Sequence, residues 1–134
     1  MIAAAVKVTS ESTEISWSPP ERLASVRYTA GITLTNKDGD FLVEALTGWI
    51  GTSREPFAVF ADALGLHGTD AEYRAKASNF FRKHRGTAFI ALINLGPMIH
   101  VVVELFRVGT GIQLKTFASE VAARSWLRTK GIAV

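Results

Sequence analysis

An uncharged segment near the middle of the chain, Thr87–Leu95, constrains the fold more than any other feature. Its apolar side chains follow one another without the alternation that a half-exposed strand requires. An extended segment of this kind must be covered on both faces, which is typical of an interior strand in a sheet flanked by helices. The sequence therefore predicts an α/β domain with this segment as its core strand.

Further strands are predicted on both sides of this segment. Residues 13–17 and 24–30 alternate polar and apolar side chains, and the pair Pro19-Pro20 lies between them, where no ladder hydrogen bond is needed. The two segments are expected to pair as a β-hairpin. Short apolar segments at Pro56–Ala61 and Ile112–Phe117 complete a sheet of five strands.

Four helices are expected between and after these strands. Their expected first or capping residues are Thr35, Thr69, Pro97 and Ser119. Thr69 is expected to act as the N-cap of the second helix, which ends at Gly86. The third segment, Met98–Val108, fits two structures: its three consecutive valines favour a strand, whereas a single polar stripe favours a helix. We interpret it as a helix.

The elements follow the order β-β-α-β-α-β-α-β-α. This order predicts a mostly parallel or mixed five-stranded sheet with about four helices packed against it. A chain of 134 residues is too short for two ordinary domains, so residues 1–134 are expected to form one domain, with residues 1–10 as a candidate flexible segment.

The composition favours a soluble cytoplasmic binding protein. The chain has no cysteine, which excludes disulfides and thiolate metal sites and fits a reducing compartment. Fifteen Lys and Arg against twelve Asp and Glu give a net charge of +3, without the dense basic stripe of a nucleic-acid-binding surface. The apolar run Met98–Phe106 is far shorter than the ~20 residues that span a bilayer, so no membrane span is expected.

No complete catalytic or metal site can be recognised in the sequence. His67, His84 and His100 lie in three different predicted elements, without the spacing of a metal motif. Asp62 follows a predicted strand at the sheet edge where α/β folds bind ligands, although an Asp there also favours a turn. Nucleophile-elbow, phosphate-loop and dinucleotide motifs do not occur. We therefore expect no catalytic residue, no metal and no cofactor.

The apolar segment Met98–Phe106 needs a cover on most of its surface. A helix that is apolar nearly all round is normally buried. The core of the domain could bury it, or a second copy of the chain could do so in a homodimer. The sequence leaves both alternatives open.

Three stretches, together with the order of elements, resemble one known family. They are Ala30–Thr35, Phe57–Asp62 and Phe117–Leu127. The chain is similar in these stretches to the STAS domain, the fold of anti-sigma-factor antagonists, and in particular to small bacterial proteins of the SpoIIAA-like group. The resemblance implies a surface around the start of the second helix that docks onto a partner kinase, and a Ser or Thr there that the kinase phosphorylates.

The motif that carries this switch in the family is Asp-Ser followed closely by Gly. The matching stretch of this chain reads Leu66-His67-Gly68-Thr69-Asp70-Ala71 and has no Asp-Ser pair. Thr69 supplies the hydroxyl at this position and is therefore the candidate phospho-acceptor. A phosphate there would be favoured by the helix dipole and repelled by Asp70 and Glu72.

These observations lead to a functional interpretation. We interpret the chain as a non-enzymatic regulatory or scaffolding module that binds a partner protein, a kinase or another regulator, through the second helix and the loop before it. The predicted partner-binding residues are Thr69, Asp70, Tyr73 and Arg74. The alternative is a small-molecule or lipid-binding module, because the chain is rich in apolar residues and the SpoIIAA-like group resembles lipid-carrier domains. An enzyme ranks last.

Overall fold

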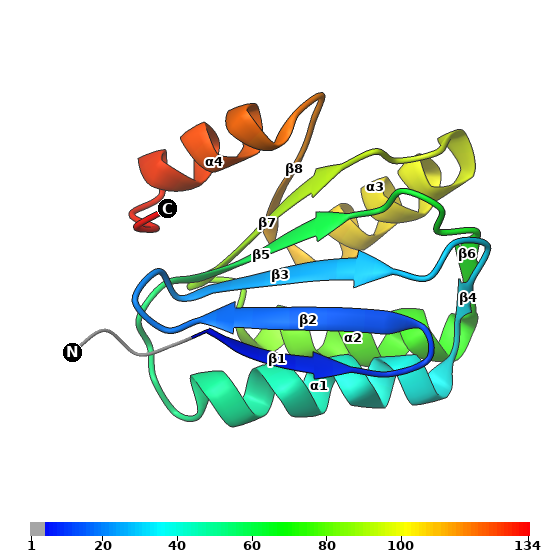
Figure 1. The fold of residues 1–134 in the computed structure, drawn as a ribbon, viewed down its shortest axis with the longest axis horizontal. Helices are drawn as coiled ribbons and strands as arrows, with labels where there is room; N and C mark the ends of the chain where they lie inside the picture. The colour runs from blue at the N-terminus through cyan, green and yellow to red at the C-terminus, as the bar shows by residue number, and fades with distance from the viewer. Residues whose placement is uncertain (1–4) are drawn as a thin grey trace.

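The predicted core strand lies in the interior of a six-stranded sheet in the computed structural model, which describes residues 5–134. The strand order is β1-β2-β3-β5-β7-β8, with antiparallel pairing from β1 to β3 and parallel pairing from β3 to β8 (Figure 1). A separate two-stranded sheet pairs β4 with β6 in parallel. The strands are β1 (Val6–Thr9), β2 (Thr13–Ser18), β3 (Leu23–Tyr28), β4 (Thr33–Leu34), β5 (Phe57–Asp62), β6 (Gly68–Thr69), β7 (Ala88–Ile93) and β8 (Gln113–Phe117).

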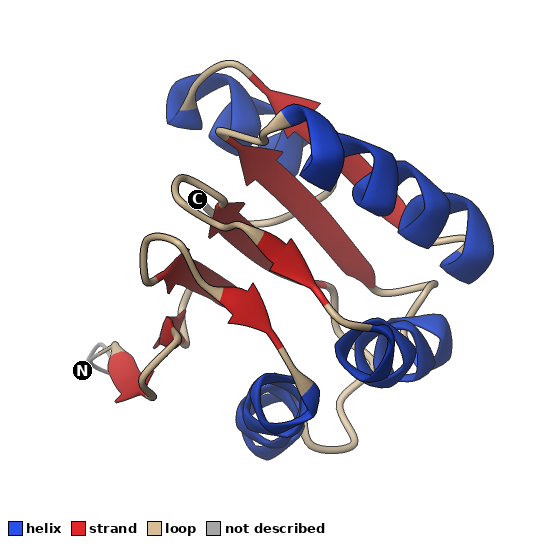
Figure 2. Cartoon of the chain, turned by 90° about the vertical axis from the view of Figure 1, so that its right-hand side faces the viewer, coloured by secondary structure: helices blue, strands red, loops and turns tan. Residues whose placement is uncertain are grey.

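Four helices cover the large sheet unequally. They are α1 (Asn36–Ile50), α2 (Ala71–Lys83), α3 (Pro97–Thr110) and α4 (Glu120–Thr129). The first three pack on one face, and α4 alone packs on the other face, over β7 and β8. Figure 1 shows α4 apart from the other helices, and Figure 2 looks along α1 and α2, which appear end-on beside each other. None of the helices in the described residues is long and apolar enough to cross a membrane.

The sheet separates two apolar clusters. The larger cluster lies under α1, α2 and α3 and includes Phe57, Leu46 and the stacked rings of Trp17 and Trp49. The smaller cluster lies under α4, where Ala123 and Leu127 have no exposed surface. All residues of β7 are buried because both clusters use its side chains. The prediction of a strand covered on both faces is confirmed.

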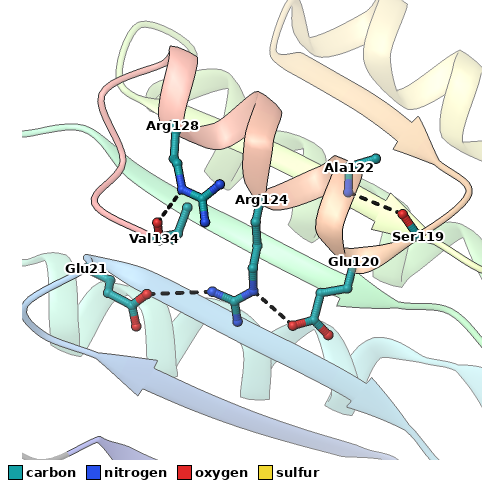
Figure 3. Close-up of polar contacts among 7 residues, drawn as sticks. All are labelled: Glu21, Ser119, Glu120, Ala122, Arg124, Arg128 and Val134. Carbon is teal, nitrogen blue, oxygen red and sulfur yellow. Dashed lines mark hydrogen bonds and ion pairs between the residues drawn. The ribbon is translucent and has the colours of Figure 1, made fainter.

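Helix α4 is also tied to the body by charged side chains (Figure 3). Arg124 Nε donates to Glu120 on the preceding turn at 2.9 Å, and its Nη1 lies 3.6 Å from Glu21 in the turn between β2 and β3. Arg128 donates to the carbonyl of Val134, which follows the helix. Polar contacts therefore surround the apolar attachment of this helix.

Two expectations about the strands differ from the structure. The sheet has six strands where the sequence analysis predicted five, because Val6–Thr9 add an edge strand beside β2. The side chains of Lys7 and Glu14 form an ion pair across this edge. Of the candidate flexible segment 1–10, residues 6–9 thus belong to the sheet, and residues 1–4 lie outside the described residues. The ambiguous segment around residues 98–108 is a helix, as predicted.

Candidate functional site

The segment that precedes α2 is held in place by backbone hydrogen bonds to the segment that precedes α1. The Gly31 amide donates to Gly65 at 2.6 Å, and the Asp70 amide donates to Leu34 at 2.8 Å. Gly65 has a φ of +80°, and a Cβ there would lie 2.9 Å from the Cα of Ala30. Only glycine fits this position without displacing the neighbouring backbone. The start of α2 is therefore fixed rather than carried on a loose loop.

Asp70, and not Thr69, is the N-cap of α2. The Asp70 carboxylate accepts a hydrogen bond from the Tyr73 amide at 2.8 Å, which satisfies one of the free amides of the first helical turn. Thr69 is instead the last residue of β6, where it pairs with Leu34. The prediction that Thr69 caps the helix was therefore wrong. Thr69 is a strand residue, and the next residue, Asp70, caps the helix.

Arg74 folds back onto Thr69. Its Nη1 donates to the Thr69 carbonyl at 2.5 Å and to the Thr69 hydroxyl at 3.2 Å. No carboxylate of residues 5–134 lies within ion-pair distance of Arg74. An exposed guanidinium thus stands beside the hydroxyl of Thr69 with its positive charge unmatched, which suits an incoming anion.

Tyr73 turns toward the interior, unlike the other three predicted partner-binding residues. It packs against the larger apolar cluster, close to Tyr28 at the end of β3. Burial raises the pKa of Tyr28 to about 12. Burial likewise raises the pKa of Tyr73 well above its usual value. Both phenols are therefore neutral at physiological pH.

Helices α1 and α2 approach closely beside this tyrosine pair. Gly39 in α1 is buried, and a Cβ there would lie 3.2 Å from the Cβ of Lys76 and 3.5 Å from the Cα of Tyr73. Lys76 and Asp40 form an ion pair across the two helices. The close approach of α2 thus explains why a glycine stands in the first turn of α1.

An apolar cavity of about 120 Å³ lies between the sheet, α2 and α3. Its walls include Ile90, Leu92 and Leu114 from the strands and Val102 and Phe106 from α3. Its polar lining consists of Tyr28, Tyr73, Thr69 and Arg74. The predicted surface site and this cavity therefore share Thr69, Tyr73 and Arg74.

Helix α3 covers the cavity without being anchored along its length. Its only buried residues are Ile99 and Thr110, which lie near its two ends, while Val102 and Phe106 between them are half-buried over the cavity. Its outer side carries Met98, Val101, Leu105 and Val108, each 60% to 80% exposed. The core of the domain therefore does not bury most of the surface of α3, and the homodimer stays a prediction.

The residues considered for metal binding and catalysis do not come together. His84 packs against the rings of Phe57 and Phe80, and burial lowers its pKa. Asp62 accepts hydrogen bonds from the Leu64 amide at 3.0 Å and from the Asn94 side chain at 2.9 Å, which is a turn-stabilising role. Within residues 5–134, no three His, Asp or Glu side chains are grouped as metal ligands would be.

A mixed sheet that begins with an antiparallel hairpin, with three helices on one face and a fourth on the other, is a SpoIIAA-like fold. A DUF3478-family protein from Shewanella loihica, described as having a SpoIIAA-like fold, superposes with a TM-score of 0.63 at 17% identity over 92% of each chain. The anti-sigma factor antagonist SpoIIAA in its unphosphorylated form superposes with a TM-score of 0.56 at 12% identity, over 93% of this chain and 98% of that one.

A third solved structure has the same fold. SiaC from Pseudomonas aeruginosa superposes with a TM-score of 0.59 at 8% identity, over 87% of this chain and all of the other. No protein-family model matches the sequence, and no curated protein matches it. The resemblance seen in the sequence is therefore confirmed for the fold.

Proposed function

We propose that the chain is a non-enzymatic regulatory module that binds a partner protein, a kinase or another regulator, at the start of α2. The observation that carries this proposal is the rigidly held segment Thr69–Arg74, whose exposed end presents Arg74 with an unmatched charge. The anti-sigma factor antagonist SpoIIAA, which has the same fold, supports a regulatory role. Tyr73 would support this surface from beneath, while Thr69, Asp70 and Arg74 form it.

Thr69 is the phospho-acceptor that this proposal favours. Its hydroxyl lies 3.2 Å from Arg74 Nη1, so a phosphate on Thr69 would sit beside a guanidinium and close to the positive end of the α2 dipole. Asp70 and Glu72 oppose the added charge. Phosphorylation would therefore draw Arg74 onto the phosphate and change the charge that the segment offers to a partner.

Charge reversal on the exposed segment tests partner binding. Asp70 is a poor choice, because its replacement removes the helix cap and costs about 1 kcal/mol. Arg74→Glu alters the proposed surface instead, and Lys83→Glu is its control, an equal charge reversal at the far end of α2. In affinity purification from the native host, we expect a partner that is retained by the wild type and by Lys83→Glu and lost from Arg74→Glu.

The same purification reports on the switch. Mass spectrometry of the recovered chain is expected to find phosphate on Thr69. A partner held equally by all three proteins would mean that the surface lies elsewhere.

The second candidate function is the binding of a small apolar molecule. The cavity of about 120 Å³ beneath α3 favours it, because protein interiors rarely contain voids larger than a water molecule. The surface and the cavity share Thr69, Tyr73 and Arg74, so the two candidate functions involve the same region of the molecule.

A further inference from the structure

The structure points to a ligand class for the cavity beneath α3: we propose that it binds a small carboxylic acid with a single ring or a short chain. The acid's apolar body would fill the cavity, and its carboxylate would pair with Arg74 at the rim. This inference rests on the small-molecule candidate described above, and it is tested separately from partner binding.

The size of the cavity limits the apolar part of the ligand. A fully apolar engineered cavity of roughly 150 Å³ stays dry and takes up benzene. The cavity beneath α3 measures about 120 Å³, so it accommodates one ring or a chain of roughly five or six carbons. A long-chain fatty acid or a phospholipid would extend well beyond this volume.

The charge of the ligand follows from the polar lining. Arg74 is the one charged residue among the residues that line the cavity, and it has no carboxylate partner in the part of the chain that the structure describes. A guanidinium matches a carboxylate through two parallel hydrogen bonds. The phenols of Tyr28 and Tyr73 are neutral, so they leave the anionic group to Arg74.

The way in is provided by α3. This helix is buried only at Ile99 and Thr110. Its contacts with α2 are more extensive than its contacts with any strand. Its half-buried middle, which includes Val102 and Phe106, therefore separates from the sheet at a lower cost than a fully packed helix would. A ligand enters by displacing this middle part while both ends stay attached.

The test uses the full chain and three probes, and binding is measured by calorimetry and by methyl NMR. Phenylacetate has a ring and a carboxylate, 2-phenylethanol has a nearly identical shape without charge, and acetate has the charge without the ring. We expect phenylacetate to bind at least about tenfold more tightly than 2-phenylethanol, and acetate not to bind. The methyl groups of Ile90, Leu92 and Leu114 should shift, because they line the cavity.

Two substitutions separate the cavity from the charge. Arg74→Gln should remove the preference for phenylacetate and leave binding of 2-phenylethanol unchanged. Val102→Phe places a ring in the cavity and should weaken both probes at least about tenfold, whereas Val101→Phe, the same change on the exposed side of α3, should weaken neither. The methyl shifts of the wild type give the location of binding even if Val102→Phe does not fold.

Each contrary result has a distinct meaning. If 2-phenylethanol binds as tightly as phenylacetate, the carboxylate class is wrong and the small-molecule candidate stands. If neither probe binds, or if the shifts lie outside the cavity, both the inference and the small-molecule candidate are overturned. Partner binding is measured separately and is untouched by either result.

Discussion

Helices α3 and α4 precede and follow the same edge strand, β8, yet they are attached to the sheet in opposite ways. Helix α4 buries Ala123 and Leu127 completely and is tied by Arg124 to Glu21, in the turn between β2 and β3 (Figure 3). Helix α3 is longer and more apolar, but it buries only residues near its ends. Total apolar content therefore does not measure how firmly a helix is held.

The two faces of the sheet therefore differ in how completely their helices cover them. On the α4 face, the apolar surface of the helix matches the surface of the strands beneath it. On the α3 face, a cavity lies beneath the helix and an apolar stripe lies on its outer side. A helix with so few buried residues is typical of elements that move or that bind ligands.

The largest expected difference comes from shortening one leucine on each helix. Leu127→Ala removes a fully buried side chain under α4 and should lower the free energy of unfolding by about 3 kcal/mol. Leu105→Ala on α3 removes a side chain that is 70% exposed and should change it by less than about 0.5 kcal/mol. Urea denaturation measures both. Equal losses would mean that the outer side of α3 is covered in solution.

A smaller effect is expected at high pH from the cavity side of the sheet. Burial raises the pKa of Tyr28 to about 12, so the folded chain keeps a proton that an unfolded tyrosine releases near pH 10. The free energy of unfolding should therefore fall as the pH rises from about 10 to about 12. Tyr28→Phe should lose about 1 kcal/mol less than the wild type by about pH 11. Parallel losses in urea denaturation would show that Tyr28 is solvated.

The smallest expected effect comes from the ion pairs. Arg124→Ala breaks the pair with Glu120 within α4 and the pair that links α4 to Glu21, at about 0.5 kcal/mol because all three side chains are partly exposed. Arg107→Ala breaks only the pair with Glu104 within α3 and should cost about 0.3 kcal/mol. Both losses should shrink in high salt. A large loss at Arg124 that shrinks in high salt would make the ion pairs, not Leu127, the main attachment of α4.

Local sequence patterns predicted the longer helices and strands, because their periodicity involves residues that are close together in the chain. The uncharged segment 87–95 contains β7, and the polar stripe on residues 98–108 correctly indicated a helix. Edge strand β1 was missed, because its Val6–Thr9 segment is a strand only by virtue of its pairing with β2. Pairing between strands depends on tertiary structure, which a short stretch of sequence does not reveal.

The candidate site was predicted only in part for the same reason. Thr69 and Asp70 are both good N-caps, and the pairing of β6 with β4, which chooses between them, depends on residues more than thirty positions away. Tyr73 was predicted as a partner-binding residue, although its spacing with Ala77 and Phe81 puts it on the side of α2 that faces the larger apolar cluster. The cavity had no sequence signal at all, since a void depends on how three helices and a sheet fit together.

One guanidinium serves two neighbouring places in this molecule. Arg74 holds the carbonyl and hydroxyl of Thr69, and it also closes the rim of the cavity. An acid seated below and a protein or phosphate arriving from outside would draw on the same positive group. By thermodynamic reciprocity, each would then alter the affinity for the other by an identical factor, with no need for a change of shape.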